Sequence, residues 1–209
     1  MTDPVRTYFG EADVDRFVRE TFFPDFSFHG TMCEIGGGDP ELLSQSRHWK
    51  LNGWRAIIIE PNPNLAQKHR EAGNEVYQVA CSDTEKEDTE FTIVHGNEMS
   101  WSALEVKDGA YLGGKLQPCT KIRVRCERLD TVLGRANCQH LDLLVVDVEG
   151  WELEVLQGFS FPLFRPAVVV VENLSRLVQY RQYMATKGYS LVKGVYINEV
   201  YAFNKESAL

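Results

Sequence analysis

Three consecutive glycines between acidic residues form the first candidate ligand-binding segment of this sequence. The stretch from Cys33 to Glu41 reads CEIGGGDPE, and it follows a short apolar run. Glycine has no Cβ, so a ligand can lie against its backbone, and it tolerates the positive φ of a tight turn. In a parallel sheet covered by helices, the turn that follows a strand is where nucleotide-like ligands bind.

Two kinds of cofactor are compatible with this turn. Dinucleotide sites use G-x-G-x-x-G, and here Gly36 and Gly38 fit while Glu41 stands at the third glycine. The segment is also similar to E-x-G-x-G-x-G of S-adenosylmethionine-dependent methyltransferases, with Pro40 in place of the last glycine. Glu34 could attract the ammonium group of that donor, whereas acids disfavour a pyrophosphate. Glu34 and Glu41 therefore favour S-adenosylmethionine over NAD.

A second acid, Glu60, ends the next predicted strand. A carboxylate at that position can accept hydrogen bonds from both ribose hydroxyls of an adenosine group. This feature is common to sites for S-adenosylmethionine and for NAD, so it supports a nucleoside-containing ligand without separating the two.

Further acids follow the apolar strands in the second half of the chain. Asp147 and Glu149 are two residues apart, so their side chains point the same way if the strand end is extended. Because a hydroxyl acceptor benefits from a group that takes its proton, these two acids and His95 are candidate bases. Glu172 could join them in holding Mg²⁺, but we predict no metal site. Glu152 suits the positive end of a helix dipole.

These residues require a sheet whose strands alternate with helices. Continuous apolar runs predict strands buried on both faces at 31–35, 56–59, 143–148 and 167–171. Period-2 patterns and turn signals predict further strands at 75–80, 90–94, 121–125, 189–192 and 199–203, the last two forming a hairpin. Helical spacing and caps predict helices at 12–23, 40–51, 63–73, 150–157 and 174–188. The pattern predicts an α/β fold with a mostly parallel sheet, helices on both faces and one antiparallel edge.

Composition restricts the class of protein and its partners. The 209 residues and the 44% hydrophobic content are typical of a globular domain, and the net charge of −8 disfavours binding to a nucleic-acid backbone. The longest aliphatic run is AVVVV, far short of the roughly 20 residues of a membrane helix. The N-terminus lacks a signal-peptide pattern, and five cysteines without C-x-x-C indicate reduced thiols. We expect a soluble, cytoplasmic protein with no nucleic-acid partner and no membrane span.

Six segments in one order resemble the FkbM family of S-adenosylmethionine-dependent methyltransferases. They are CEIGGGDPELLSQS, GWRAIIIEPNP, VACSD, ERLDTVL, DLLVVDVEGWELEVLQG and PAVVVVEN. The most specific piece is D-V-E-G-x-E-x-x-V-L-x-G, from Asp147 to Gly158. The resemblance covers about residues 31–205 and departs at residues 36–40, where relatives more often carry a single glycine and then Asp-Gly.

This resemblance implies the transfer of a methyl group to a hydroxyl of a sugar or small metabolite. It also implies the Rossmann-like class I methyltransferase fold, a seven-stranded sheet with an antiparallel last strand. By position in the motifs, the resemblance implies that Glu34, Gly36 and Gly38 hold the methionine portion of the donor and that Glu60 holds its ribose. It also implies that Ser82 and Asp83 border the adenine and that Asp147 faces the junction between donor and acceptor.

The predicted organisation is an N-terminal helical segment, residues 1–30, followed by the methyltransferase domain, residues 31–209. The phenylalanine-rich first segment would cover the sheet or contact a second copy in a homodimer. Residues 95–119 are irregular and rich in glycine, so we expect an acceptor lid in which Trp101 and Tyr111 stack on a sugar face.

Two other functions fit the same sequence. One is a binding module that holds S-adenosylmethionine without catalysis, and the other is an NAD-dependent dehydrogenase. Binding of the donor without methyl transfer would indicate the first, and binding of NAD alone would indicate the second.

Overall fold

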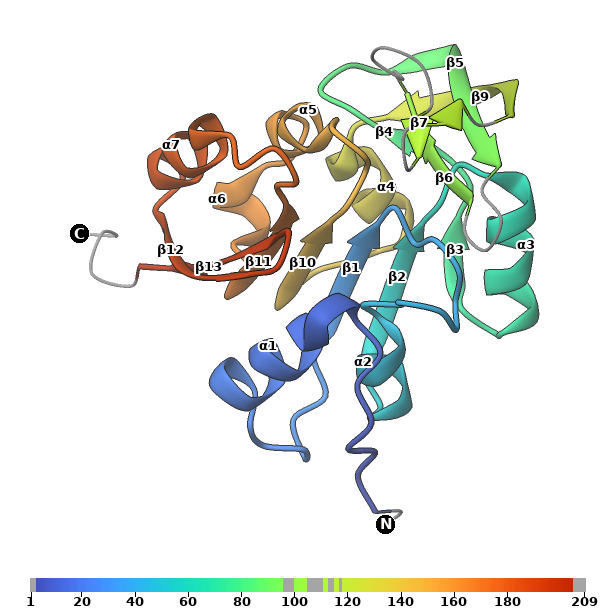
Figure 1. The fold of residues 1–209 in the computed structure, drawn as a ribbon. Helices are drawn as coiled ribbons and strands as arrows, with labels where there is room; N and C mark the ends of the chain where they lie inside the picture. The colour runs from blue at the N-terminus through green and yellow to red at the C-terminus, as the bar shows by residue number, and fades with distance from the viewer. Residues whose placement is uncertain (1–2, 96–99, 105–110, 113–114, 117, 205–209) are drawn as a thin grey trace.

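The computed structural model describes residues 3–95, 100–104, 111–112, 115–116 and 118–204 (Figure 1). Its centre is a seven-stranded sheet in the order β12-β13-β11-β10-β1-β2-β3. The strands are β1 Thr31–Ile35, β2 Arg55–Ile59, β3 Glu75–Tyr77, β10 Leu143–Val146, β11 Val168–Glu172, β12 Tyr189–Val195 and β13 Asn198–Phe203. β13 runs antiparallel to both its neighbours, and the other neighbouring pairs are parallel. The predicted fold, with its antiparallel last strand, is confirmed.

The sheet is buried on both faces because its central strands are mostly apolar, with acids near the carboxyl ends of β1 and β11. One face packs against α4 Leu129–Arg135, α5 Glu152–Gln157, α6 Phe161–Phe164 and α7 Val178–Thr186. The other face packs against α1 Val14–Phe22 and α2 Arg47–Leu51. α3 Pro63–Glu71 lies beside β3 (Figure 1). Asn62 and Pro63 begin α3 as predicted, since the Asn62 Oδ1 accepts a hydrogen bond from the Asn64 N–H.

The N-terminal segment covers the sheet, one of its two predicted roles. Val14 and Val18 of α1 are buried in the same core as Met32 of β1 and Val200 of β13. This core joins α1 to β13, and the division of the chain at residue 30 stays a prediction. The homodimer contact stays a prediction.

The helix predicted over residues 40–51 is wrong in its first half, because α2 begins only at Arg47. Asp39 Oδ1 accepts a hydrogen bond from the Glu41 N–H at 2.9 Å, and Leu43 has a left-handed φ of +54°. Side-chain acceptors thus take backbone N–H groups that a helix would use, which favours a loop.

A second sheet lies next to the main one, in the order β4-β9-β5-β6 (Figure 1). Its strands are β4 Ala80–Cys81, β5 Lys86–His95, β6 Ser100–Ala103 and β9 Cys119–Glu127, and the short pair β7 Tyr111–Leu112 and β8 Lys115–Leu116 forms a third sheet. The prediction of irregular structure throughout 95–119 is therefore wrong for these strands. The rest of the predicted lid, and the side chains of Trp101 and Tyr111, lie outside the described residues. No described helix has both the length and the apolar character needed to span a membrane.

Candidate functional site

Acidic residues gather at the edge where the parallel strands of the main sheet end. Glu34 lies in β1, Glu60 follows β2, Asp147 follows β10 and Glu172 ends β11. Because β2, β1, β10 and β11 are neighbours and parallel, their carboxyl ends meet along one line. The strand-end acids predicted from the sequence are therefore brought together.

The glycine turn after β1 is packed against the chain itself at two of its three positions. Gly36 has a φ of +83°, and a Cβ there would lie 1.7 Å from the carbonyl oxygen of Asp147. A Cβ on Gly37 would lie 2.4 Å from Ile58 Cγ2. Gly38 has a φ of +56° and nothing within 4 Å of its Cβ position. Only Gly38 therefore leaves space in which a ligand can lie against the backbone.

Glu60 is tied to the glycine turn by its carboxyl group. Its Oε2 accepts a hydrogen bond from the Gly38 N–H at 2.9 Å, and its Oε1 accepts one from the Asn62 N–H at 2.7 Å. Burial nonetheless raises the pKa of Glu60 to about 7. Each carboxyl oxygen has a second lone pair, so Glu60 can still accept hydrogen bonds from a diol.

Glu34 is the least satisfied acid of the site. It is 3% exposed, and its Oε1 accepts a hydrogen bond from the Gln45 N–H at 3.1 Å. The Ser46 hydroxyl also stabilises the ionised carboxylate, but no donor among the described residues lies within hydrogen-bonding distance of the buried Oε2. Burial raises the pKa of Glu34 to about 8. A buried oxygen without a partner is unfavourable, so this position fits a ligand that carries positive charge or donates a hydrogen bond.

Gln45 connects two of these acids and was not foreseen from the sequence. Its backbone N–H reaches Glu34, and its Nε2 donates a hydrogen bond to Asp147 Oδ2 at 3.4 Å. The only signal in the sequence was its place in the segment after the glycines. Gln45 thus links Glu34, near the end of β1, to Asp147, which follows β10.

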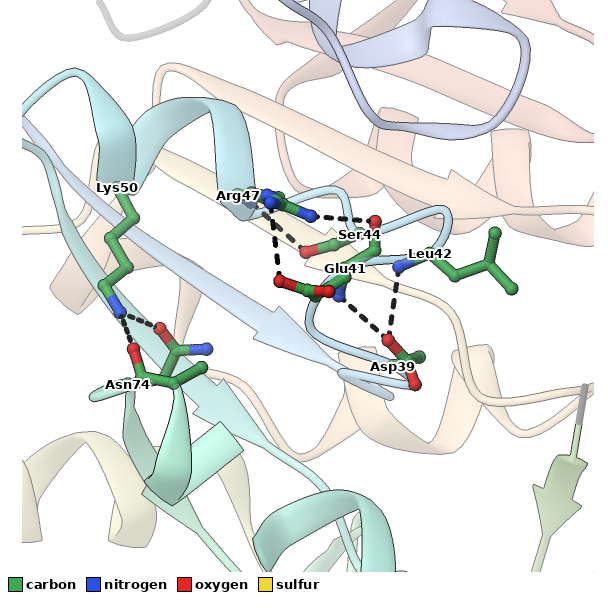
Figure 2. Close-up of polar contacts among 8 residues, drawn as sticks. Asp39, Glu41, Leu42, Ser44, Arg47, Lys50 and Asn74 are labelled. Carbon is green, nitrogen blue, oxygen red and sulfur yellow. Dashed lines mark hydrogen bonds and ion pairs between the residues drawn. The ribbon is translucent and has the colours of Figure 1, made fainter. Parts of the chain in front are cut away.

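Polar side chains fix the loop that presents Gln45 (Figure 2). The Arg47 N–H donates a hydrogen bond to Ser44 Oγ at 3.2 Å, and the Arg47 guanidinium reaches the Glu41 carbonyl oxygen at 3.2 Å. Asp39, at the start of the loop, forms an ion pair with Lys68 of α3 at 2.7 Å. The loop is therefore held at both ends without being helical.

Asp147 and Glu172 are hydrogen-bonded to each other through their carboxyl groups, which requires a proton between them. Burial and the nearby charge of Asp147 raise the pKa of Glu172 far above that of an ordinary carboxyl group. Burial raises the pKa of Asp147 only to about 6. The proton therefore belongs to Glu172 at neutral pH, and Asp147 is the ionised partner.

Glu152 holds the turn that follows β10. It is 2% exposed, its Oε1 accepts hydrogen bonds from the N–H groups of Val148 at 3.1 Å and Gly150 at 2.9 Å, and its Oε2 accepts one from the Tyr180 hydroxyl at 2.7 Å. Within the turn, Glu149 has a left-handed φ of +59°. The condition under which Asp147 and Glu149 would point the same way, an extended strand end, is therefore not met, and Glu152 does more than complement a helix dipole.

The three predicted bases lie in different surroundings. Burial and the charge of Asp147 raise the pKa of Glu149, so these two acids are neighbours. His95 is exposed at the end of β5, and its Nε2 lies 2.8 Å from Thr120 Oγ1 in the second sheet. None of the described contacts of His95 is with the acids of the site, and its catalytic role stays a prediction.

Ser82 and Asp83 contact the β10 turn through a tryptophan. Ser82 Oγ donates a hydrogen bond to Asp83 Oδ1 at 3.0 Å and accepts one from Trp151 Nε1 at 3.1 Å. Trp151 follows the turn directly, and no motif in the sequence singles it out. No described contact joins Ser82 or Asp83 to Glu60, so the predicted border of the adenine stays a prediction.

The acids are not arranged as a metal site in the part of the chain that the structure describes. No group there of three or more histidine, cysteine, aspartate or glutamate residues has a geometry that could hold a metal ion. Glu172, the proposed third ligand, is engaged with Asp147 instead.

The chain is similar to known methyltransferases in both sequence and fold. A family profile described as the methyltransferase FkbM domain matches residues 34–191, which is most of the chain. The solved structure of the methyltransferase FkbM from Methylobacillus flagellatus KT has a TM-score of 0.54 and 12% sequence identity. That comparison covers 87% of this chain but only 46% of the other, so this chain spans about half of that protein's length.

A second solved structure, the small RNA methyltransferase HEN1, has a TM-score of 0.44 and 12% identity, with coverage of 100% of this chain and 28% of the other. A likeness at that level carries no argument about function. No curated protein matches the sequence significantly. The profile match over most of the chain, together with the sheet order and the acids at the strand ends, shows that the chain belongs to the FkbM methyltransferase domain family.

Proposed function

We propose that this protein uses S-adenosylmethionine to methylate a hydroxyl group of a sugar or other small molecule. The observation that carries the proposal is the buried, unpartnered Glu34 Oε2 near the open backbone of Gly38. An electrophilic methyl group on a sulfonium is the chemistry that this donor supplies when bound. A donor with both an ammonium and a sulfonium group suits a site whose acids have no cationic partner in the described part of the chain.

Three residues are assigned to donor binding. Glu34 would accept a hydrogen bond from the ammonium group, which would satisfy Oε2 and favour the ionised carboxylate. Gly38 would allow the methionine chain to approach the backbone. Glu60 would accept hydrogen bonds from the ribose hydroxyls while it keeps its bonds to the N–H groups of Gly38 and Asn62.

Asp147 is assigned as the base. The acceptor oxygen must lie in line with the methyl group, which is mainly a matter of orientation. As the acceptor oxygen forms its bond to the methyl carbon, the bond from that carbon to the donor sulfur would break, S-adenosylhomocysteine would leave, and the hydroxyl proton would pass to the Asp147 carboxylate. The proton on Glu172 keeps Asp147 ionised, because a hydrogen bond from a neutral carboxyl stabilises the charged form. Glu149 is the alternative base, since it lies beside Asp147.

Calorimetric titration with S-adenosylmethionine, S-adenosylhomocysteine and NAD in parallel tests the donor. We expect binding of the first two and none of NAD. Replacing Glu60 with alanine removes a charged hydrogen-bond acceptor, so donor affinity should fall by about 10- to 100-fold. The exposed Glu71→Ala on α3 is the matched control, and its affinity should equal that of the wild type. Binding of NAD alone, or equal affinities for Glu60→Ala and wild type, would overturn the assignment.

A transfer assay separates catalysis from mere binding. Asp147→Ala should bind S-adenosylhomocysteine nearly as well as the wild type and should not transfer methyl from a radiolabelled donor. Full transfer by Asp147→Ala would exclude this residue as the base. Donor binding by the wild type without transfer to any hydroxyl compound would favour the non-catalytic binding module.

A further inference from the structure

Asn198, the first residue of β13, has a side-chain amide that nothing in the described structure satisfies. The residue is 1% exposed, and neither its Nδ2 nor its Oδ1 has a hydrogen-bond partner. Other buried amides of this chain are paired: Asn52 bonds to Val5 and His48, and Asn173 bonds to Leu177. Because nearly all buried polar groups in native proteins have partners, the lone exception among these amides points to an external one.

The amide lies at the end of the row of site acids. Asn198 is the register partner of Glu172 in the antiparallel pair β11–β13, so the two side chains share a face of the sheet. Val170 and Val200, two residues from each, lie in the core beneath α1, which identifies that face. Asp147 lies on it too, because it bonds to Glu172.

The surroundings of this row restrict the charge of what can bind there. None of the site acids Glu34, Asp147, Glu149 and Glu172 forms an ion pair with a described lysine, arginine or histidine. A phosphate or carboxylate group beside these acids would therefore meet like charge, and Lys193, which shares the face as the register partner of Val200, lies over the Phe17 ring instead of pairing with them. An amide needs both an acceptor for its N–H and a donor for its oxygen, and a hydroxyl group supplies either.

We propose that Asn198 binds hydroxyl groups of an uncharged polyol acceptor and orients that acceptor toward Asp147. This inference rests on the proposed methyl transfer. It adds two points to it: Asn198 as a residue that selects the acceptor, and an acceptor without net charge. Asn198 acts through hydrogen bonds to the acceptor and does not exchange a proton.

Entry of the acceptor requires part of the cover over this face to move. The turn before α1 is strained, since Ala12 and Asp13 have left-handed φ values of +50° and +58°. Non-glycine residues adopt this conformation at some cost in free energy, so a bound acceptor that displaces the turn also relieves strain. The same turn carries Glu11, whose charge reaches Asp147 and Glu149.

The test compares Asn198→Leu with the matched control Asn52→Leu. Leucine has nearly the shape of asparagine but no polar atoms. If Asn198 serves a ligand, Asn198→Leu should unfold at the same or a higher temperature than the wild type. Asn52→Leu should unfold at a lower temperature, because it removes the side-chain partners of the Val5 N–H and carbonyl and one of the two hydrogen bonds to the His48 carbonyl. An equal loss of stability in both variants would show that Asn198 is structural and would overturn the proposal.

The functional arm uses methyl glycosides of glucose, mannose and rhamnose, with glucuronic acid and glucose 6-phosphate as charged counterparts. The wild type should transfer methyl only to uncharged glycosides, and Asn198→Leu should lose at least about tenfold in kcat/KM, with unchanged affinity for S-adenosylhomocysteine. Equal transfer by both proteins would mean that only a water molecule satisfies Asn198, and transfer by the wild type to the charged sugars would refute the acceptor class. Failure of the wild type to bind S-adenosylhomocysteine would refute the proposed function itself.

Discussion

Glu152→Ala should destabilise the protein and also impair the site, because Glu152 holds the turn after β10. The substitution removes three hydrogen bonds, from the Val148 N–H, the Gly150 N–H and the Tyr180 hydroxyl. At about 1 kcal/mol net for each bond, the free energy of unfolding should fall by about 3 kcal/mol. For a domain of this size, that corresponds to a decrease in the unfolding temperature of about 6–12 °C.

Glu154→Ala is the matched control for this prediction. Glu154 lies in the same first turn of α5 but has no side-chain hydrogen bond among the described residues. Its loss removes only an interaction with the helix dipole, which is about 0.3–1 kcal/mol. Denaturant unfolding with both variants measures the difference. Equal destabilisation would mean that Glu152 acts only on the dipole, and would refute the role assigned to it in the turn.

The remaining predictions concern the donor side of the site. Burial raises the pKa of Glu34 from its ordinary 4.5 to about 8, so between these pH values the folded protein holds a proton that the unfolded chain has lost. The ligand-free protein should therefore lose stability as the pH rises from about 4.5 to about 8. In denaturant unfolding from pH 5 to 8, the midpoint of Glu34→Gln should fall less steeply with pH than that of the wild type. An equal fall in both proteins would contradict the raised pKa of Glu34. Gly36→Ala should not fold, because its Cβ would overlap the Asp147 carbonyl oxygen. Gly38→Ala should fold, with a loss of about 1 kcal/mol in the free energy of unfolding, and should bind S-adenosylhomocysteine weakly, as circular dichroism and calorimetry can show. A folded Gly36→Ala variant beside an unfolded Gly38→Ala variant would refute the packing argument.

The fold could be predicted because its signals are local. Runs such as Ala56 to Ile59 are apolar at every position, which is typical of strands buried on both faces, and the Asn62-Pro63 pair marks a helix start. The first half of the helix predicted over residues 40–51 failed because Asp39 and its neighbours use side chains to bind the backbone of the loop. Such competition depends on geometry that a helical pattern does not contain.

The candidate site was predictable only where a residue ends a parallel strand. Glu34, Glu60 and Asp147 follow that rule, since parallel strands bring their ends to one edge. Gln45 and Asn198 do not follow it. Their importance comes from contacts, or missing contacts, with distant parts of the chain, and a single sequence does not show these.

The position of β13 has a consequence for biosynthesis. This strand follows all the other strands of the main sheet in the chain, yet it lies inside the sheet, between β11 and β12. Until it leaves the ribosome, β11 has an unpaired edge and the face beneath α1 lacks Val200. The nascent chain can therefore build its first strands early, but the wall that would hold an acceptor forms only after all the other strands of the main sheet have been made. A ribosome that stalls before residue 198 would release a chain with an open, aggregation-prone sheet and no acceptor site.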